Sequence, residues 1–250
     1  MIYLSIRKTL DWKNAALVAA RLNPQFRAKV AMWNETFQMP YNEFRHEMKA
    51  IAQRNLANVA GATIVPIDEV PPGALLVPVD DDDWFAPDVI QRLEAVIEPD
   101  RTGYYWIRNI LEPPAAKSPL KRWLRSRRLL ELGPDAKQGR FTCGTNNYAF
   151  VTTANSSRVA LSHGVASRLF DAYPDRVKRL PATLSLQNRN FSSQTALAFR
   201  RPRISRRELL RTHRSYLRLY PRVRLTEGLA WAAPYIDAVA ELTASLRQSR

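Results

Sequence analysis

Four consecutive aspartates at 80–83 are the residues of this chain whose type and spacing most clearly suggest chemistry. They come directly after the apolar run ALLVPV at 74–79, which has the composition of a buried strand. Alternate residues of a strand face the same side, so we expect Asp80 and Asp82 to point together. Carboxylates held this close repel each other, and a divalent cation removes that penalty. Oxygen ligands suit Mg²⁺ and Mn²⁺, which commonly neutralise a diphosphate.

A solvated acidic turn is the alternative interpretation of the aspartates, because acidic turns are common and Asp88 follows closely. Two features favour a binding site instead. The 250-residue chain has a formal net charge of +15, so a cluster of four acidic residues is unusual for its composition. The aspartates also lie between a strand and a helix predicted to begin at Pro87, and sheets of α/β proteins bind ligands at the carboxyl ends of their strands.

Apolar segments of strand length alternate with segments of helical periodicity. We predict strands at 2–7, 28–33, 62–67, 74–79, 103–110 and 146–153, and helices at 12–22, 41–60, 86–97 and about 229–247. This order predicts an α/β fold in which a mostly parallel central sheet carries helices on both faces. His46 and His213 are interpreted as helix-surface residues and are given no role.

The stretch from about residue 50 to 95 combines a helix, a glycine, an apolar strand, the aspartates, an aromatic pair and a proline. In this chain these features are Arg54-Asn55, Gly61, Asp80-Asp81-Asp82 with Asp83, Trp84-Phe85 and Pro87. The combination resembles the nucleotide-binding half of GT-A glycosyltransferases, especially bacterial members of family 2. The resemblance is fainter over 1–40. It implies a GT-A-like fold, a nucleotide-sugar donor and a divalent cation, Mn²⁺ or Mg²⁺.

The resemblance also implies roles for individual residues. Donor contacts would come from Asp80, Asp81, Arg54, Asn34 and Glu35. Metal ligands would be Asp82, with Asp83 and His163 in support, and the acceptor would meet Trp84, Gly144, Thr145, Asn146 and Asn147. A structural role is the alternative for Arg54, Asn34, Glu35 and His163.

The second half of the chain departs from the family pattern. No Glu-Asp pair follows the segment CGTNNYAFVTT, so Asp171 is the candidate for a base that deprotonates the acceptor, with a helix-end role as the alternative. The segment LSLQNRNFSSQT has no histidine where relatives show one. The choice between an inverting and a retaining mechanism therefore stays open.

Basic segments interrupt and follow the predicted catalytic domain, residues 1–198. We divide that domain into a nucleotide-sugar half, about 1–98, and an acceptor half, about 99–198, with a basic insertion at 113–140. The C-terminal region, 199–250, is predicted to be a basic helical appendage. Residues 200–224 hold ten arginines and one acid, and these residues together with 121–130 suit an anionic membrane or nucleic acid phosphates.

Several classes of protein are disfavoured by what the sequence lacks. One cysteine permits no internal disulfide, and no apolar run has the length of a signal-peptide core or of a membrane span. We therefore expect a cytoplasmic protein, peripheral on the inner face of the membrane. Gly-rich phosphate loops, Gly-x-Ser-x-Gly, His-Glu-x-x-His and Cys-x-x-Cys motifs are absent.

The expected function is therefore a metal-dependent transfer of a sugar from a nucleotide-diphosphate sugar to a glycan or lipid-linked glycan. If the metal interpretation holds, membrane docking is the more economical explanation of the basic segments, and nucleic acid is not expected as a partner. Two alternatives stay open: a basic nucleic-acid-binding protein, and a metal-dependent nuclease or phosphotransferase that uses the aspartates. The sequence names no donor sugar or acceptor.

Overall fold

The computed structural model describes residues 1–6, 24–80, 82–113, 130–132, 147–153, 163–190, 192 and 205–249. The helix predicted at 12–22, most of the insertion at 113–140 and the boundary predicted near 199 lie outside these residues. In the description below, strands are labelled β, α-helices α and short 3-10 helices η.

The largest sheet has six strands in the order β2-β1-β3-β8-β5-β9. They are β1 (Ile2–Ile6), β2 (Thr63–Ile64), β3 (Leu75–Val79), β5 (Gly103–Trp106), β8 (Tyr148–Val151) and β9 (Val177–Leu180). Only β8 runs against its neighbours among these strands, so the predicted mostly parallel sheet is confirmed. Because β1 and β3 pair in parallel from Ile2–Leu75 to Ile6–Val79, they end at the same edge.

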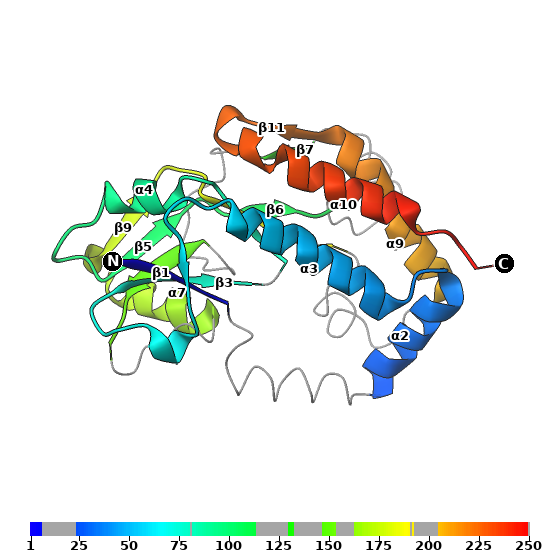
Figure 1. The fold of residues 1–250 in the computed structure, drawn as a ribbon, viewed down its shortest axis with the longest axis horizontal. Coiled ribbons are helices and arrows are strands. Elements are labelled where there is room, and N and C mark those ends of the chain that lie inside the picture. Colours follow the sequence, from blue (N-terminus) through cyan, green and yellow to red (C-terminus); the bar gives the residue numbers. More distant parts are fainter. Residues whose placement is uncertain are drawn as a thin grey trace.

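Helices cover both faces of this sheet, as predicted (Figure 1). On one face, α7 (His163–Ala172) packs Phe170 into a core that includes Leu76. The approach is close, because a Cβ on Gly103 of β5 would lie 2.7 Å from Phe170 Cε1. On the other face, α4 (Val89–Glu94) and the C-terminal end of α3 (Tyr41–Ala57) cover the strands.

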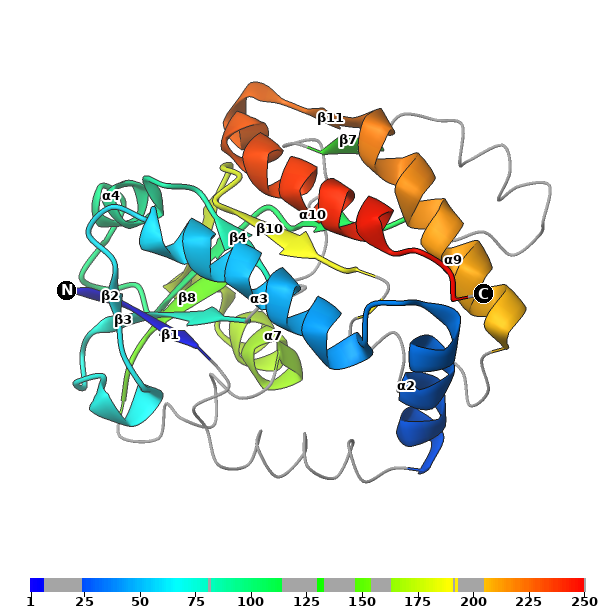
Figure 2. The same ribbon diagram turned by 45° about the vertical axis from the view of Figure 1, so that its right-hand side comes forward.

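A second core lies beside the sheet, among four helices (Figure 2). These are α2 (Pro24–Thr36), α3, α9 (Arg206–Leu219) and α10 (Ala233–Ser245). Two small sheets join them, β4-β10-β6 and β11-β7, built from β4 (Trp84–Phe85), β6 (Asn109–Leu111), β7 (Leu130–Leu132), β10 (Ser185–Asn188) and β11 (Val223–Leu225). The C-terminal helices thus share a core with α2 and α3.

Short 3-10 helices connect several of these elements. They are η2 (Ile67–Glu69), η3 (Pro174–Arg176), η4 (Tyr220–Arg222) and η5 (Glu227–Ala232). The last of them leads directly into α10, so the C-terminal α-helix begins later than the predicted residue 229.

Two predicted strands are wrong or incomplete. The segment predicted as a strand at 28–33 belongs to α2, because Phe26, Trp33 and Phe37 recur at helical spacing and are all buried. The strand predicted at 103–110 breaks after Trp106, and its second part, β6, pairs with β10 in another sheet. A side chain was also misjudged, since His213 is buried on α9 rather than at the surface.

Candidate functional site

Asp80, Asp82 and Asp83 lie just after the carboxyl end of β3, beside the end of β1. The strand ends at Val79, and the Asp83 N–H approaches the Asp80 carbonyl oxygen at 3.5 Å, which brings the chain back on itself. Asp80 and Asp82 therefore lie beyond the strand, so the strand alternation from which we expected them to point together does not apply to them. We call Asp80, Asp82 and Asp83 together the aspartate loop.

Arg45 of α3 is the cation that meets the aspartate loop. Its Nη1 donates to Asp82 Oδ2 over 3.0 Å, and the two side chains are only 10% and 17% exposed. Burial by itself would lower the pKa of Arg45, but the charge of Asp82, helped by Tyr41 and Asp80, raises it above its ordinary value. The buried guanidinium therefore stays charged beside the Asp82 carboxylate, which is unlike the environment of a solvated acidic turn.

Asn55 fixes the segment that follows the aspartate loop. This fully buried side chain donates from Nδ2 to the Phe85 carbonyl oxygen over 2.9 Å and accepts from the Phe85 N–H at Oδ1 over 2.7 Å. Both polar groups of the Phe85 backbone are thus paired with one side chain. Asn55 therefore ties β4 to α3 directly after the aspartates.

Arg54, the predicted phosphate contact, occupies a different place on the same helix. It is exposed in the last turn of α3. Nine residues separate it from Arg45, which corresponds to a rotation of about 180° around the helix and about 13 Å along it. The side of α3 that bears Arg45 is therefore not the side that bears Arg54.

Asp83 links the aspartate loop to the end of β10. It is 1% exposed, and its Oδ1 accepts from the Asn188 N–H over 2.8 Å. The Asn188 side chain is itself buried, and its amide has no hydrogen-bond partner within the part of the chain that the structure describes. Asp83 therefore contacts β10, whereas Asp82 contacts Arg45 of α3.

A second arginine, Arg108, lies near enough to Asp83 for the two charges to interact. Arg108 donates from Nε and Nη2 to Gln187 Oε1 of β10, over 3.2 and 2.8 Å. Burial and the neighbouring charge of Arg189 lower the pKa of Arg108, while Asp83 acts in the opposite direction. Positive charge thus lies on two sides of the aspartate loop.

Two residues predicted to bind the acceptor, Trp84 and Asn147, are among those that the structure describes, and both lie in the interior. Trp84 is fully buried, and its ring centroid is 5.9 Å from that of Tyr235. Asn147 is also buried and donates from Nδ2 to the Trp106 carbonyl oxygen over 3.3 Å. Both side chains therefore serve packing in this structure. The other predicted acceptor contacts, at 144–146, lie outside the described residues, as does Asp81.

The two residues predicted to meet the base of the donor lie on α2. Asn34 Oδ1 accepts from the Tyr41 N–H over 2.9 Å, so it satisfies a free donor in the first turn of α3. Glu35 is exposed on the same helix. Both residues belong to a helix and do not follow a strand, because α2 continues to Thr36.

Asp171 and His163 belong to α7. Asp171 is exposed near the end of this helix, which leads through η3 into the start of β9. Since β9 runs in the same direction as β3, that start lies at the sheet edge opposite the aspartate loop. The structure therefore does not bring Asp171 to the aspartates. His163 begins α7, and its side chain lies outside the described residues.

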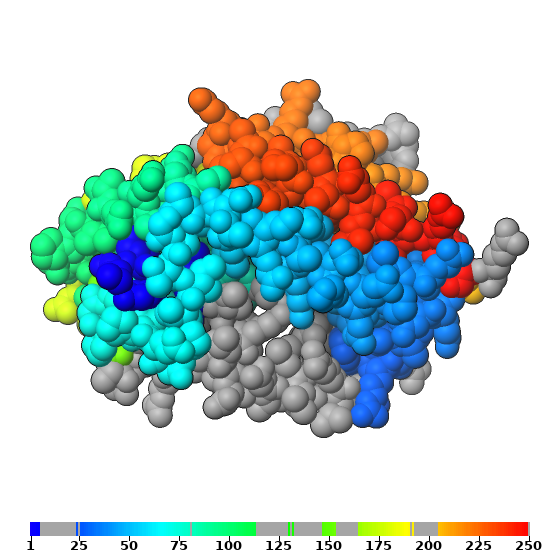
Figure 3. All heavy atoms as spheres, in the orientation of Figure 1, coloured from blue at the N-terminus to red at the C-terminus, as the bar shows by residue number. Residues whose placement is uncertain are grey.

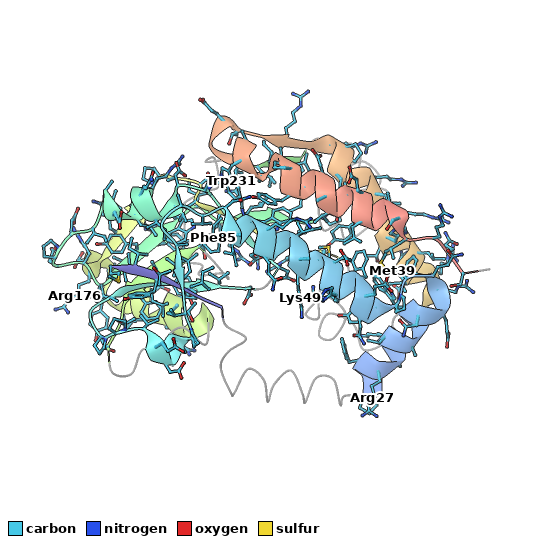
Figure 4. The ribbon with its side chains drawn as sticks, in the orientation of Figure 1. Arg27, Met39, Lys49, Phe85, Arg176 and Trp231 are labelled. Atoms are coloured by element: carbon cyan, nitrogen blue, oxygen red, sulfur yellow. The ribbon has the colours of Figure 1, made fainter. Side chains whose placement is uncertain are left out.

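A cavity of about 590 Å³ lies between α2 and α3. Figure 3 shows both helices at the surface on one face of the molecule, and Figure 4 shows Lys49 on the side of α3 away from α10. Arg45 lines this cavity and also contacts Asp82. The cavity and the aspartate loop are therefore joined through one side chain.

The described residues contain neither a ready cluster of metal ligands nor a helix that could span a membrane. Within them, no three or more His, Cys, Asp or Glu side chains cluster in a way that could hold a metal ion. Every helix described is too short or too polar to span a lipid bilayer.

Comparison of the chain with protein-family models, with curated proteins and with solved structures gives no match. The geometry of the site is therefore the basis for a functional proposal.

Sequence reasoning missed Arg45 and gave Asn55 no role of its own, although a signal was present. The buried stripe of α3 runs through Tyr41, Arg45, Met48, Ala52 and Asn55, at alternating spacings of four and three. A polar side chain at a position where the helix pattern requires an apolar one must find a partner when it is buried. Polar residues inside an apolar stripe were therefore the available sign of a structured polar site.

Proposed function

We propose that the protein is a metal-dependent glycosyltransferase of GT-A-like fold that uses a nucleotide-diphosphate sugar. The observation that carries the proposal is the aspartate loop, which stands at the carboxyl end of β3 and is anchored on both sides by buried contacts. Such edges are where the sheets of α/β proteins bind ligands. A solvated acidic turn does not explain buried carboxylates, because burying a charged group costs free energy.

The donor set fits a hard divalent cation shared with a ligand. Asp80 and Asp82 supply carboxylate oxygens, and Mg²⁺ commonly uses one or two carboxylates together with substrate phosphates. Bound there, the cation would supply positive charge to the departing nucleoside diphosphate. Arg45 would hold Asp82 in place and add a second positive charge beside the loop. The attacking hydroxyl would belong to a glycan or lipid-linked glycan.

A thermal-shift panel tests this function. UDP, GDP, CMP and dTDP are each added with and without Mn²⁺, and a ligand that binds only the folded protein raises its melting temperature. We expect a manganese-dependent rise with one nucleotide. Asp80→Asn and Asp82→Asn should abolish that rise.

Asp88→Asn is the matched control, because Asp88 is the next carboxylate along the chain and pairs with Arg92 at the surface. The control should keep the full rise in melting temperature. A rise that persists in both loop variants, or no rise with any nucleotide in folded protein, would contradict the proposal.

A specific observation supports membrane contact by α9. Its buried side carries Leu209, His213, Tyr216 and Leu219. Its exposed side carries Arg206, Arg207, Arg211, Arg214 and Arg218. We propose that this cationic side meets anionic lipid, which would bring the site to a lipid-linked acceptor.

A further inference from the structure

The small sheet β4-β10-β6 has two faces of different character. Leu186 of β10 and Leu111 of β6 belong to the second core, so the face that carries them packs against the helices. Side chains alternate along a strand, so Gln187 and Ile110, which pair across the two strands, lie on the other face. Both residues are partly exposed, and Ile110 takes part in none of the three cores that the described residues form. Solvent therefore reaches this second face of the sheet.

Two arginines lie on the same face as Gln187. Arg108, directly before β6, donates from Nε and Nη2 to Gln187 Oε1, which places its guanidinium there. Arg189 directly follows β10, two positions after Gln187, and both arginines are partly exposed. Burial and the positive charge of Arg189 lower the pKa of Arg108, so the two cations are close enough to repel each other. We call Arg108 and Arg189 the arginine pair.

The charge of Arg108 is the less compensated of the two. Arg189 Nη1 forms an ion pair with Glu112 Oε2 over 3.3 Å. Arg108 forms no ion pair within the described ranges, and its hydrogen bonds go to the neutral amide of Gln187. Neighbouring groups, Asp83 among them, offset the lowering of its pKa only in part. Its Nη1 makes no hydrogen bond to any residue that the structure describes, so its two N–H groups remain for a ligand.

The arginine pair adjoins the aspartate loop. The Asn188 N–H, at the end of β10, donates to Asp83 Oδ1 over 2.8 Å, and Arg189 is the next residue of the chain. Arg108 is near enough to Asp83 for their charges to interact. An anion placed at the arginine pair would relieve the repulsion between the two cations and would accept charge-assisted hydrogen bonds. The planar fork of a guanidinium matches the oxygens of a phosphate group.

We propose that Arg108 and Arg189 bind a phosphate group of a ligand that lies beside the aspartate loop. Gln187 holds the Arg108 guanidinium in place, and Arg108 Nη1 donates to the phosphate oxygens. The proposal does not rest on sugar transfer, since it requires neither a metal nor a nucleotide-sugar. The phosphate belongs either to a nucleotide or to a phosphorylated acceptor.

Isothermal titration calorimetry with inorganic pyrophosphate tests the proposal, in buffer that contains EDTA so that no metal contributes. We expect the wild-type chain to bind pyrophosphate and Arg108→Gln to bind it about tenfold or more weakly, because the exchange removes a charged hydrogen-bond donor. Arg108→Lys keeps the charge without the planar fork, so it should recover only part of the affinity.

The melting temperature without ligand separates a binding role from a structural one. A lowered pKa means that folding disfavours the charged form of Arg108, so Arg108→Gln should melt no lower than the wild type. Arg176→Gln is the matched control, since Arg176 is exposed in η3, before β9, at the sheet edge opposite the aspartate loop. The control should bind pyrophosphate as the wild type does. Equal binding by the wild type and Arg108→Gln, or no binding by folded wild-type chain, would overturn the proposal.

Parallel titrations with UDP and with farnesyl phosphate, both in EDTA, identify the source of the phosphate. Weaker binding of UDP to Arg108→Gln than to the wild type would assign the site to the phosphates of a nucleotide. Weaker binding of farnesyl phosphate alone would assign it to a lipid-linked acceptor, and no effect on either ligand would contradict the proposal. Asp80→Asn and Asp82→Asn should not weaken pyrophosphate binding in EDTA, so this site and the proposed metal site are tested separately.

Discussion

At the residue scale, the aspartate loop depends on two buried polar side chains of α3 and on one backbone N–H of β10. Arg45 neutralises Asp82, Asn55 pairs both backbone groups of Phe85, and the Asn188 backbone pairs Asp83. Each contact joins residues far apart in the sequence. The positions of the carboxylates are therefore set by partners that surround the loop rather than by the loop sequence itself.

Asn55→Ala tests how much the Asn55 contact contributes. The substitution leaves a buried N–H and a buried carbonyl of Phe85 without their partner, which costs about 2–4 kcal/mol of unfolding free energy in total. Chemical denaturation followed by circular dichroism measures the loss. Arg54→Ala, at the exposed neighbouring residue, should change stability by no more than about 0.5 kcal/mol. Equal effects of the two variants would show that the contact with Phe85 is unimportant.

At the element scale, the pairing of α9 with α10 explains why one helix can be strongly basic and still be part of a core. The apolar side of α9 carries a buried histidine, and His213 Nε2 lies 2.8 Å from the Thr243 carbonyl oxygen of α10. A carbonyl only accepts hydrogen bonds, so this nitrogen carries the hydrogen. The ring also meets Phe37 in a T-shaped contact, with centroids 5.1 Å apart. His213 thus joins α9 to two other elements.

The stability of this packing should depend on pH. Burial lowers the pKa of His213, and the Thr243 contact opposes this only in part. As the pH falls below about 6.5, the unfolded chain takes up the proton before the folded chain does, so stability is lost toward acid. We expect the free energy of unfolding to fall between pH 7.5 and pH 5.5 in the wild type.

The fall between these two pH values should be smaller in His213→Gln, because glutamine keeps a hydrogen-bond donor and does not titrate. Urea denaturation at the two pH values measures it. His46→Gln, at an exposed residue of α3, controls for the loss of a histidine as such. An unchanged pH dependence in His213→Gln would rule out His213 as its source.

At the scale of the whole molecule, a formal net charge of +15 surrounds a small acidic site. The field of such a chain attracts polyanions and raises the rate at which anionic ligands arrive. The cavity lies between α2 and α3, whereas the arginines of the outer side of α9 belong to another helix. They can therefore be altered independently.

Vesicle sedimentation tests the role of α9. Binding to vesicles with anionic lipid should exceed binding to neutral vesicles and should weaken as salt rises. Each arginine near an anionic membrane contributes about 1 kcal/mol of binding free energy. The triple variant Arg207→Gln/Arg214→Gln/Arg218→Gln should therefore bind anionic vesicles roughly 100-fold more weakly than the wild type. The three side chains are exposed, and the variant should stay folded.

The control is a second triple variant, in which glutamine replaces the exposed arginines Arg54, Arg168 and Arg176. It should weaken binding to anionic vesicles much less. Equal losses in the two triple variants would mean that net charge, rather than α9, determines binding. Tight, salt-dependent binding to DNA that survives Asp80→Asn and Asp82→Asn, with no vesicle binding, would instead favour the nucleic-acid alternative.

Hydrophobic periodicity alone determined much of the fold. Strand β3, helix α3 and the mostly parallel sheet were all predictable, because burial imposes a repeat of two or 3.6 residues on the chain. The place of the aspartates at a strand end followed from the same pattern. The helix α2 was misjudged because its buried aromatic residues extend beyond the short window 28–33 that was interpreted as a strand.

Only the tertiary structure decided which side chains meet the aspartates. The ion pair of Arg45 with Asp82 spans 37 positions, and the contact of Asp83 with Asn188 spans 105. No local pattern encodes such separations, since they arise when α3 and β10 both pack against one loop. Similarly, the exposed Arg54 and the buried Arg45 belong to one helical segment of sequence. Rotation about the helix axis and the position of the neighbouring elements determine which of the two reaches the site.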